Sequence, residues 1–302
     1  MDLVARMNRL PRPGETVTGE SFLSVPGGKG ANQAVAASRL GADVVFIGRV
    51  GDDAFGASLR QLLVAAGVDT SLVSDTQDCC SGVALIGVDV NGANAITVIP
   101  GANGRLTEAD IESSAEMIAS ADAVVLQLET PIDTVAAAIR IARRHQVITI
   151  LDPAPAPAGP LPPLLMSVDI ISPNQTEAEA ITGIAVVDLA SATEAARAMQ
   201  RNGAKQVVLK LGELGALVLT QDGTVHQIPA ITAMVVDTTA AGDAFTAALA
   251  VAICEGHSLE VAARWGTWAG TIACTRFGAQ PSMPTRLDVE QFGAEHGLRF
   301  TL

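Results

Sequence analysis

A glycine-containing turn at residues 237–245 combines the groups that a phosphate transfer requires. The run reads Asp-Thr-Thr-Ala-Ala-Gly-Asp-Ala-Phe, follows Val235 and Val236, and opens an alanine-rich segment that we expect to be a helix. Free N–H groups and the dipole at a helix start favour an anion there. Asp243 on the same turn could accept a proton from an attacking hydroxyl. The alternative is an ordinary N-cap aspartate in a glycine turn.

A second glycine turn, at residues 27–34, reads Gly-Gly-Lys-Gly-Ala-Asn-Gln-Ala and also leads into an expected helix. It is not a P-loop, because Lys29 is followed by Gly30 rather than by serine or threonine, and it is not a G-x-G-x-x-G motif. The amide of Asn32 could hydrogen-bond a polyol. The alternative is a tight turn into a packed helix.

A third candidate lies at residues 174–177, which read Asn-Gln-Thr-Glu after an expected strand. The carboxylate of Glu177 and the amide of Asn174 could orient a hydrated Mg²⁺ near phosphates. The alternative is a capped helix start.

Composition narrows the class of protein. The 302 residues permit one large domain, or one domain with a small appendage, and 49% apolar residues supply a sizeable core. The net charge of −13 argues against a nucleic-acid partner, so an anionic ligand must be held by local donors. The four cysteines form no C-x-x-C pair and the histidines lack zinc-ligand spacing, which favours reduced thiols and no zinc site.

No apolar run approaches the about 20 residues of a membrane span, and no signal peptide opens the chain. We therefore expect a cytoplasmic protein without a membrane partner.

Alternating patterns predict an α/β fold. Helices are expected at 31–40, 53–66, 108–119, 131–144, 177–182, 191–201, 242–255 and 259–275, and strands at 44–47, 123–128, 147–151, 168–172 and 206–210. Strands that alternate with helices indicate a mostly parallel sheet sandwiched by helices.

Two early extended stretches do not fit that sheet. Residues 15–25 are rich in strand formers, and the Asn91-Gly92 pair lies between two short apolar runs, which is a strong hairpin signal. A second hairpin is expected over 216–228. We place residues 3–26 and 82–100 in a small, discontinuous β lid, and residues 27–81 and 101–302 in an α/β core that binds the ligands.

Together, the two glycine turns resemble the two signatures of the PfkB carbohydrate kinase family, in the right order and far apart. The similarity is to its ribokinase branch and extends over nearly the whole chain. It includes the runs at 11–17, 101–103, 152–156 and 278–282. The ribokinase-like fold is therefore expected, together with ATP-dependent phosphorylation of a small sugar, ribose at its 5-hydroxyl in the first place.

The resemblance implies a role for each matching position. Asp243 would be the base, and the backbone N–H groups of Ala240, Ala241, Gly242 and Asp243 would form the anion hole for the γ-phosphate. The implied sugar ligands are Asp2, Gly28, Lys29, Gly30, Ala31, Asn32, Glu129 and Asp243. The implied ATP contacts are Asn174, Lys210, Leu211, Gly212, Glu213, Leu214, Gly215, Gly242, Asp243 and Thr267.

The resemblance also implies two metal ions and a partner. Glu177 would place Mg²⁺ through water. A K⁺ ion, held mostly by backbone carbonyls, would fix the turn that shapes the anion hole. The implied K⁺ positions are Asp237, Thr239, Ala273, Arg276, Gly278 and Ser282. Lid strands are expected to pair across a homodimer and to close over the sugar.

Two departures from the family pattern stand out. The family opens with a core strand and a Gly-x-x-Asn-x-Asp turn, and Met1 and Asp2 fall at the last two places of that turn. A core without its first central strand would have unpaired backbone groups and a less stable sheet. In addition, Thr267 stands where ribokinases often carry histidine or asparagine near the adenine.

Three hypotheses remain open at this level. The first is a kinase for ribose, and the second a PfkB kinase for deoxyribose, a ketohexose or a nucleoside. The third is a catalytically weak sugar-binding or regulatory protein, against which the intact Gly242 and Asp243 argue.

Overall fold

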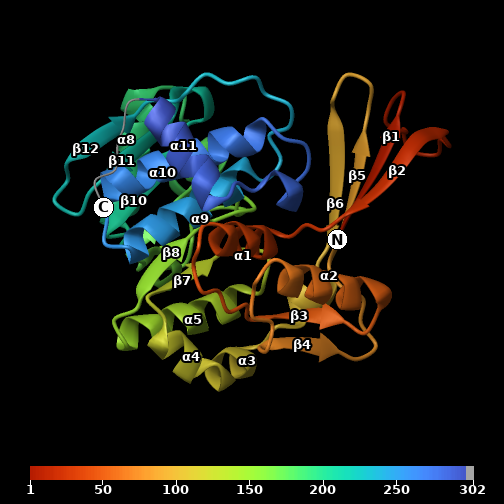
Figure 1. Ribbon diagram of the computed structural model, residues 1–302, viewed down its shortest axis with the longest axis horizontal. Coiled ribbons are helices and arrows are strands. Elements are labelled where there is room, and N and C mark those ends of the chain that lie inside the picture. The colour runs from red at the N-terminus through yellow and green to blue at the C-terminus, as the bar shows by residue number, and fades with distance from the viewer. Residues whose placement is uncertain (297–302) are drawn as a thin grey trace.

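The computed structural model describes residues 1–296, in which the principal sheet has six strands in the order β12-β11-β10-β9-β8-β7 (Figure 1). The strands are β7 (Ala123–Leu126), β8 (Ile148–Leu151), β9 (Ile170–Ile171), β10 (Gln206–Lys210), β11 (Ala216–Leu219) and β12 (Val225–Ile228). Strands β7 to β10 pair in parallel, and β11 and β12 add an antiparallel hairpin at one edge. The predicted mostly parallel sheet is confirmed.

Both faces of this sheet are covered, which explains why its strands are apolar at successive positions. Along β10, Val208 packs into one buried cluster, while Val207 and Leu209 pack into another on the opposite face. Side chains of a strand alternate between the two faces of the sheet. Since both faces are covered here, the residues in the middle of the strand must be apolar at successive positions.

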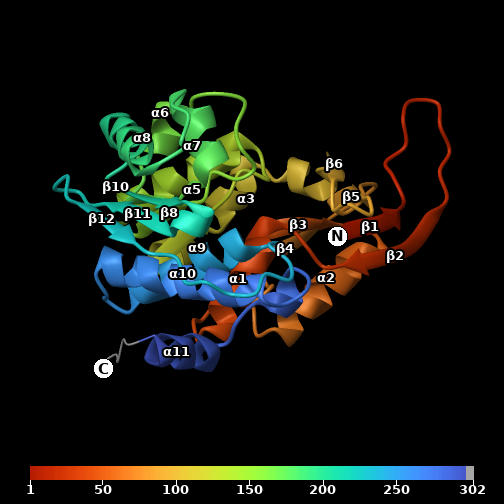
Figure 2. The ribbon, with the colours of Figure 1, turned by 90° about the horizontal axis from the view of Figure 1, so that it is seen from above.

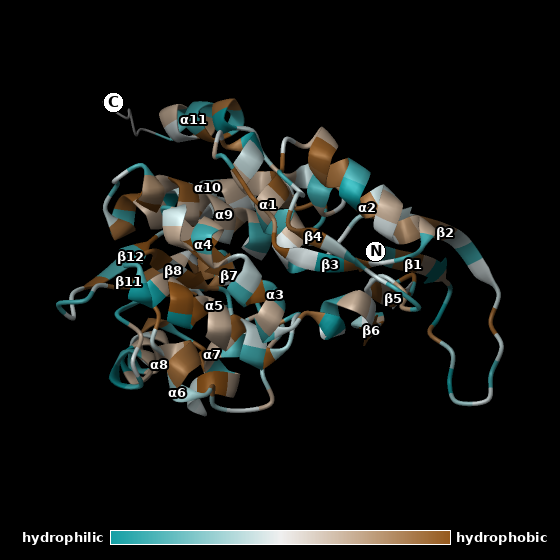
Figure 3. Cartoon of the chain, turned by 90° about the horizontal axis from the view of Figure 1, so that it is seen from below, coloured by the Kyte–Doolittle hydropathy of each residue, from teal (hydrophilic) through white to brown (hydrophobic). Residues whose placement is uncertain are grey.

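The helices divide between these faces. One cluster includes α1 (Lys29–Arg39), α9 (Ala241–Cys254) and α10 (Leu259–Cys274). The other includes α5 (Ile132–Arg144), α6 (Pro163–Met166), α7 (Gln175–Thr182) and α8 (Leu189–Arg201). The remaining helices are α2 (Ala54–Ala65), α3 (Glu108–Ser113), α4 (Ala115–Ser120) and α11 (Arg286–Glu295). Figure 3 shows apolar colouring where α9, α10 and the strands meet.

A second sheet, which we call the lid sheet, stands apart from this body (Figures 1 and 2). Its strands are β1 (Asp2–Met7), β2 (Gly19–Val25), β5 (Val83–Val88) and β6 (Asn94–Ile99), in the order β2-β1-β5-β6. The hairpin expected at Asn91-Gly92 joins β5 and β6 in antiparallel pairing. The division into a core (27–81 and 101–302) and a lid (3–26 and 82–100) stays a prediction, and the last six residues of that core lie outside the described part.

Two expected elements differ in the structure. The helix expected over 108–119 is broken into α3 and α4 at Ser114, because the hydroxyls of Ser113 and Ser114 both donate to the carbonyl of Asp110 and compete with the helix ladder. The strand expected over 44–47 is absent. It forms one isolated bridge, from Val45 to Asp69, although its side chains pack into the core.

A short parallel pair follows instead, made of β3 (Gly48–Gly51) and β4 (Val73–Thr76), which form a separate sheet. The described helices include none that is both long and apolar enough to cross a membrane.

Candidate active site

The candidate site lies at the carboxyl ends of the four parallel strands. Gln127 and Glu129 follow β7, Asp152 follows β8, Asn174 follows β9, and Lys210 ends β10. Parallel strands end at the same edge of their sheet, where α/β proteins generally bind ligands. The fold therefore gathers polar residues that are far apart in the sequence.

The start of α1 brings the expected sugar ligands together. Gly28 caps the helix with a φ of 92°, which favours glycine, and the backbone N–H of Lys29 donates to Oε2 of Glu129 at 2.8 Å. A Cβ on Gly27 would overlap the carboxylate of Asp2, so a larger residue there would displace that carboxylate. Asp2, in lid strand β1, is thereby placed against this turn.

Asp243 occupies the first turn of α9 but does not cap it. The N-cap is Ala240, in left-handed conformation with a φ of 59° and without a side-chain cap. The Asp243 carboxylate instead accepts hydrogen bonds from Nδ2 of Asn32 at 2.9 Å and from Nε2 of Gln33 at 3.1 Å. The N-cap alternative is excluded, and both glycine turns meet at one buried carboxylate.

Asn32 carries a buried atom that points to a missing ligand. Its Nδ2 must face Asp243, since an ionised carboxylate can only accept hydrogen bonds. Its Oδ1 has no hydrogen-bond partner among the described residues, and Asn32 is only 5% exposed. Buried polar atoms are normally paired, so this oxygen fits a ligand hydroxyl.

Burial dominates the electrostatics of the site. It raises the pKa of Asp243, which Lys29 lowers and Asp152 raises further. Burial likewise raises the pKa values of Asp2 and Glu129. Burial lowers the pKa of Lys29, but the negative charges of Asp243, Asp152 and Glu129 outweigh this effect and raise it overall. Lys29 is therefore a cation that these surrounding carboxylates keep protonated.

The sequence analysis missed a polar network behind Asp243. Nε2 of Gln33 also donates to Oδ2 of Asp152 at 2.8 Å, and Nε2 of Gln127 donates to Oε1 of Gln33 at 2.5 Å. Lys210 places its ammonium 2.8 Å from Oδ1 of Asp152. The sequence did contain a signal for this network, because Gln127 and Asp152 are polar residues that directly follow apolar strands.

The residues expected to contact ATP lie on several different elements. Gly242 and Lys210 are adjacent, since a Cβ on Gly242 would lie 3.7 Å from Nζ of Lys210. The segment from Leu211 to Gly215 forms the turn between β10 and β11 and includes the 3-10 helix Gly212–Leu214. Thr267 is buried in α10 and donates its hydroxyl to the carbonyl of Ala263, so its side chain is already engaged.

Asn174 and Glu177 form a reciprocal cap at the start of α7. The Glu177 N–H donates to Oδ1 of Asn174, and the Glu177 carboxylate accepts from both nitrogens of Asn174. The capped helix start is therefore observed. Burial raises the pKa of Glu177, as does Asp152, while Lys210 lowers it.

The expected K⁺ loop brings two distant segments together. Asp237 accepts from the N–H and hydroxyl of Thr239 and, with its other oxygen, from the N–H of Gly278 at 2.9 Å. These bonds outweigh burial and lower the pKa of Asp237. Ala273 and Arg276 follow at the end of α10, where the Arg276 N–H donates to the Ala273 carbonyl.

Ser282 ends the 3-10 helix Gln280–Ser282, and its hydroxyl donates to Ala279. From the lid sheet, Arg6 lies 5.9 Å from the ring centroid of Phe277, next to this loop.

Residues present could accommodate both ions. Within residues 1–296, no three side chains of the His, Cys, Asp and Glu types form a metal cluster. Glu177 nevertheless supplies the oxygen that Mg²⁺ prefers when it keeps most of its waters. The loops around Asp237 and Gly278 are joined at the Asp237 carboxylate, and their carboxylate and carbonyl groups are oxygen donors of the kind that suits a hard monovalent cation.

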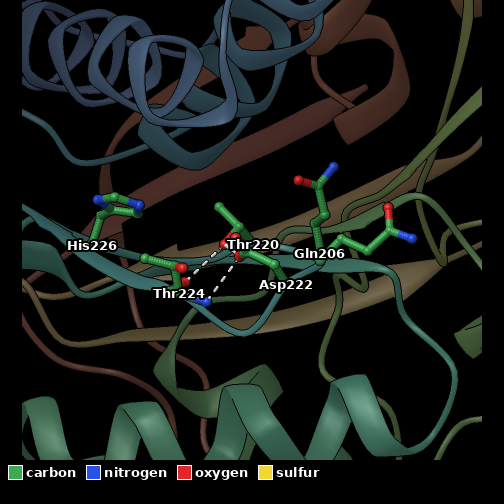
Figure 4. A pocket seen from close by; sticks show the side chains of 6 residues that line it. Gln206, Thr220, Asp222, Thr224 and His226 are labelled. Carbon is green, nitrogen blue, oxygen red and sulfur yellow. Dashed lines mark hydrogen bonds between the residues drawn. The ribbon is translucent and has the colours of Figure 1, made fainter.

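Another hollow, of about 560 Å³, lies away from this site (Figure 4). It is lined by Gln206, Thr220, Gln221, Asp222, Thr224 and His226. Gln206 begins β10 and Lys210 ends it, so the hollow is at the opposite end of the strand, about 13 Å away. None of the expected site residues lines it.

Known proteins resemble this chain over nearly its whole length. The model of the "pfkB family carbohydrate kinase" matches residues 1–286. A ribokinase of Haemophilus influenzae is 39% identical over 291 residues, covering 96% of this chain and 94% of the relative. A deoxyribokinase of Salmonella typhimurium is 37% identical, covering 97% of this chain and 94% of that protein.

Solved structures show the same fold. The Arabidopsis thaliana ribokinase complexed with ribose and ATP superposes with a TM-score of 0.91 at 34% identity, covering 96% of this chain and 95% of that one. The Thermotoga maritima ribokinase superposes with a TM-score of 0.87 at 34% identity and the same coverage. With a family model matched over most of its length and relatives well above 30% identity, this chain belongs to the pfkB family of carbohydrate kinases.

Proposed function

We propose that this chain transfers the γ-phosphoryl group of ATP to the 5-hydroxyl of D-ribose. The observation that carries the proposal is the buried Asp243 carboxylate in the first turn of α9, held by Asn32 and Gln33 from the other glycine turn. The ribokinase relatives and the Arabidopsis complex with ribose and ATP support ribose as the acceptor.

The reaction needs a base and a site for negative charge, and α9 supplies both. Asp243 accepts the proton of the 5-hydroxyl while that oxygen bonds to the γ-phosphorus and the bond to ADP breaks. The N–H groups at residues 240–243 would face the transferring group, since the first N–H groups of a helix have no partner within it; that of Ala241 also donates to the carbonyl of Thr238, at 3.3 Å. Phosphoryl transfer depends mainly on such positioning and charge stabilisation.

The ribose would lie between α1 and the lid sheet. Oδ1 of Asn32 would accept a hydrogen bond from one sugar hydroxyl, and the carboxylates of Asp2 and Glu129 would accept hydrogen bonds from others. Carboxylates and amides suit a sugar because they pair well with adjacent hydroxyls. The backbone of residues 28–31 approaches the sugar closely, which the glycines at 28 and 30 allow. Closure of the lid sheet over the sugar would exclude water from the reaction.

ATP would extend from the start of α9 toward the β10–β11 turn. Asn174, Gly242 and the segment 210–215 contact it, with Thr267 near the base. Mg²⁺, placed through water by Glu177, would neutralise charge on the phosphates. K⁺ at the Asp237–Gly278 loop would stiffen the turn that presents the N–H groups of α9.

We further propose a homodimer formed through the lid sheet. Large apolar side chains on one face of this sheet are exposed to solvent, Val98 by 60%, Ile96 by 55% and Leu23 by 41%, and the strand register places them on neighbouring rows of that face. Contiguous exposed apolar surface commonly marks an interaction site. A cytoplasmic location is proposed because ATP is the phosphoryl donor.

The deoxyribokinase relatives favour one competing substrate, 2-deoxy-D-ribose. It differs from ribose only at the 2-hydroxyl, so both sugars present the same 5-hydroxyl to Asp243. A site that pairs its polar groups with the 2-hydroxyl should discriminate against its absence.

A coupled ADP-release assay tests the proposal. It should compare D-ribose, 2-deoxy-D-ribose, D-fructose and a nucleoside, each with and without K⁺. We expect kcat/KM for ribose to exceed that for deoxyribose by at least about tenfold and K⁺ to raise turnover. Absence of turnover with either pentose would reject the proposed function, and a preference for deoxyribose would replace ribose as substrate.

A further inference from the structure

Two buried carboxylates, Asp243 and Asp152, are joined by a single amide. Asp243 is 4% and Asp152 1% exposed, and Nε2 of Gln33 donates to both, at 3.1 and 2.8 Å. A primary amide nitrogen has two hydrogens, so both are used here. The other end of the same amide accepts from Gln127. Gln33 can therefore hold only one orientation while Asp152 is in place.

Asp152 is in turn held by a buried ammonium group. Nζ of Lys210 lies 2.8 Å from Oδ1 of Asp152 and 3.5 Å from the hydroxyl of Thr246, and the side chains of Lys210 and Asp152 are only 12% and 2% exposed. A buried ion pair contributes little net stability compared with apolar residues of similar size. Stability alone therefore does not explain this pair.

Lys210 also faces the start of α9. A Cβ on Gly242 would lie 3.7 Å from Nζ of Lys210, so the ammonium is beside the turn that would hold the transferring phosphate. The series of hydrogen-bonded side chains Gln33, Asp152 and Lys210 thus leads from the proposed base to the proposed anion hole.

We propose that Asp152 and Lys210 are a positioning pair for the transfer. Asp152 holds the Gln33 amide in the orientation that aims it at Asp243, and Lys210 keeps a positive charge beside Gly242. This inference rests on the proposed function, and it assigns a role to two side chains that do not touch the sugar.

The pair also sets the charge that Asp243 experiences. Three charged groups face Asp243 directly, namely Lys29 from α1, Asp152 after β8 and Glu129 after β7. Lys210 lies beyond Asp152 on β10. Burial raises the pKa of Asp243 most, Lys29 lowers it, Asp152 raises it, and the hydrogen bond from Gln33 has a smaller lowering effect. Neutralising Asp152 should therefore lower the pKa of Asp243.

The substitution Asp152→Asn tests both parts. An asparagine offers one acceptor where Gln33 and Lys210 now have two, so the Gln33 amide loses its fixed orientation. We expect kcat to fall roughly 10- to 100-fold, the range for a misplaced reacting group, with the Kd for ribose within threefold of wild type. The acid limb of the kcat/KM profile should move to lower pH. A kcat within threefold and an unmoved acid limb would overturn the proposal.

Asp169→Asn is a matched control. Asp169 precedes β9 and pairs with Lys205, which precedes β10, at 2.6 Å. The same residue types thus meet at the opposite edge of the same sheet, in a more exposed position. We expect kcat and the acid limb to match wild type. An equal loss in both variants would show that any broken ion pair slows the enzyme, and would reject a specific role.

Two further measurements cover the remaining cases. If Asp152→Asn does not fold, the double variant Asp152→Asn/Lys210→Met removes the uncompensated charge and should show at least the same fall in kcat, because it also removes the charge beside Gly242. Without any turnover, unfolding equilibrium constants of Asp152→Asn, Asp243→Asn and their combination still report the contact. We expect the change in the unfolding equilibrium constant of the double variant to differ from the product of the two single changes by at least fivefold. A difference under twofold would refute the link between Asp152 and Asp243 through Gln33.

The outcomes separate the two proposals. Wild-type protein that phosphorylates no pentose but shows the coupling in unfolding would reject the proposed function and retain the link between the two carboxylates through Gln33. Wild-type protein that phosphorylates ribose and is indifferent to Asp152→Asn would reject the positioning pair alone.

Discussion

Replacing Asp243 by asparagine should separate base catalysis from sugar binding. The side chain keeps its shape, but an amide cannot take the proton of the 5-hydroxyl. General bases contribute at least about 10²-fold to rate, which corresponds to about 2.7 kcal/mol of transition-state stabilisation. We therefore expect kcat to fall by at least about 10²-fold, with the Kd for ribose within about threefold of wild type.

The effect on folding follows from the contacts of Asp243. Its carboxylate accepts from both Asn32 and Gln33, and an asparagine offers one oxygen, so one donor loses its partner at a cost of about 1–3 kcal/mol. Against this, burial raises the pKa of Asp243, so this group destabilises the folded state as the pH rises above the ordinary pKa of an aspartate. The two effects oppose each other, and we expect a small net change in the free energy of unfolding.

The assay is ADP release for turnover and calorimetry for ribose binding, with thermal unfolding to confirm that the variant is folded. Asp133→Asn is the control, since Asp133 is an exposed acid in the first turn of another helix, α5. Turnover of Asp243→Asn within threefold of wild type would refute Asp243 as the base. An equal loss in Asp133→Asn would show that the fall is not specific to the site.

Three other predictions concern pH, the cation loop and assembly. Because the pKa of Asp243 is raised, kcat/KM should fall as pH drops through a value above the ordinary aspartate range; an acid limb below about 3.9 would contradict this. Asp237→Ala removes three hydrogen bonds, two within its own loop and one to Gly278 in the other loop, and should raise the K⁺ concentration for half-maximal activity, measured by K⁺ titration; an unchanged value would reject the loop as the K⁺ site. Val98→Glu should convert the dimer to monomer in light scattering, whereas Val187→Glu, at an exposed apolar residue far from the lid sheet in sequence, should not; wild type that is already monomeric would reject the interface.

The sequence predicted most elements because their signals are local. Glycines at the ends of helices, the Asn91-Gly92 turn and the apolar strands each act through a few neighbouring residues. The broken helix at Ser114 shows the limit of such signals, since the serine hydroxyls compete with the helix through contacts that periodicity does not reveal. The absent strand at 44–47 shows another, because an apolar run is equally compatible with core packing outside a sheet.

By itself the sequence determined the family and its two glycine turns, and it selected Asp243, because these depend on residue type and spacing along the chain. Only the tertiary structure decided that Asn32 and Gln33 contact Asp243 from 211 and 210 positions away, and that Asp152 pairs with Lys210 58 positions further on. The reason is the parallel sheet. Its helical crossovers bring the carboxyl ends of β7 to β10 to one edge, and α1 packs against α9, so residues become neighbours by strand order and helix packing and not by distance in sequence.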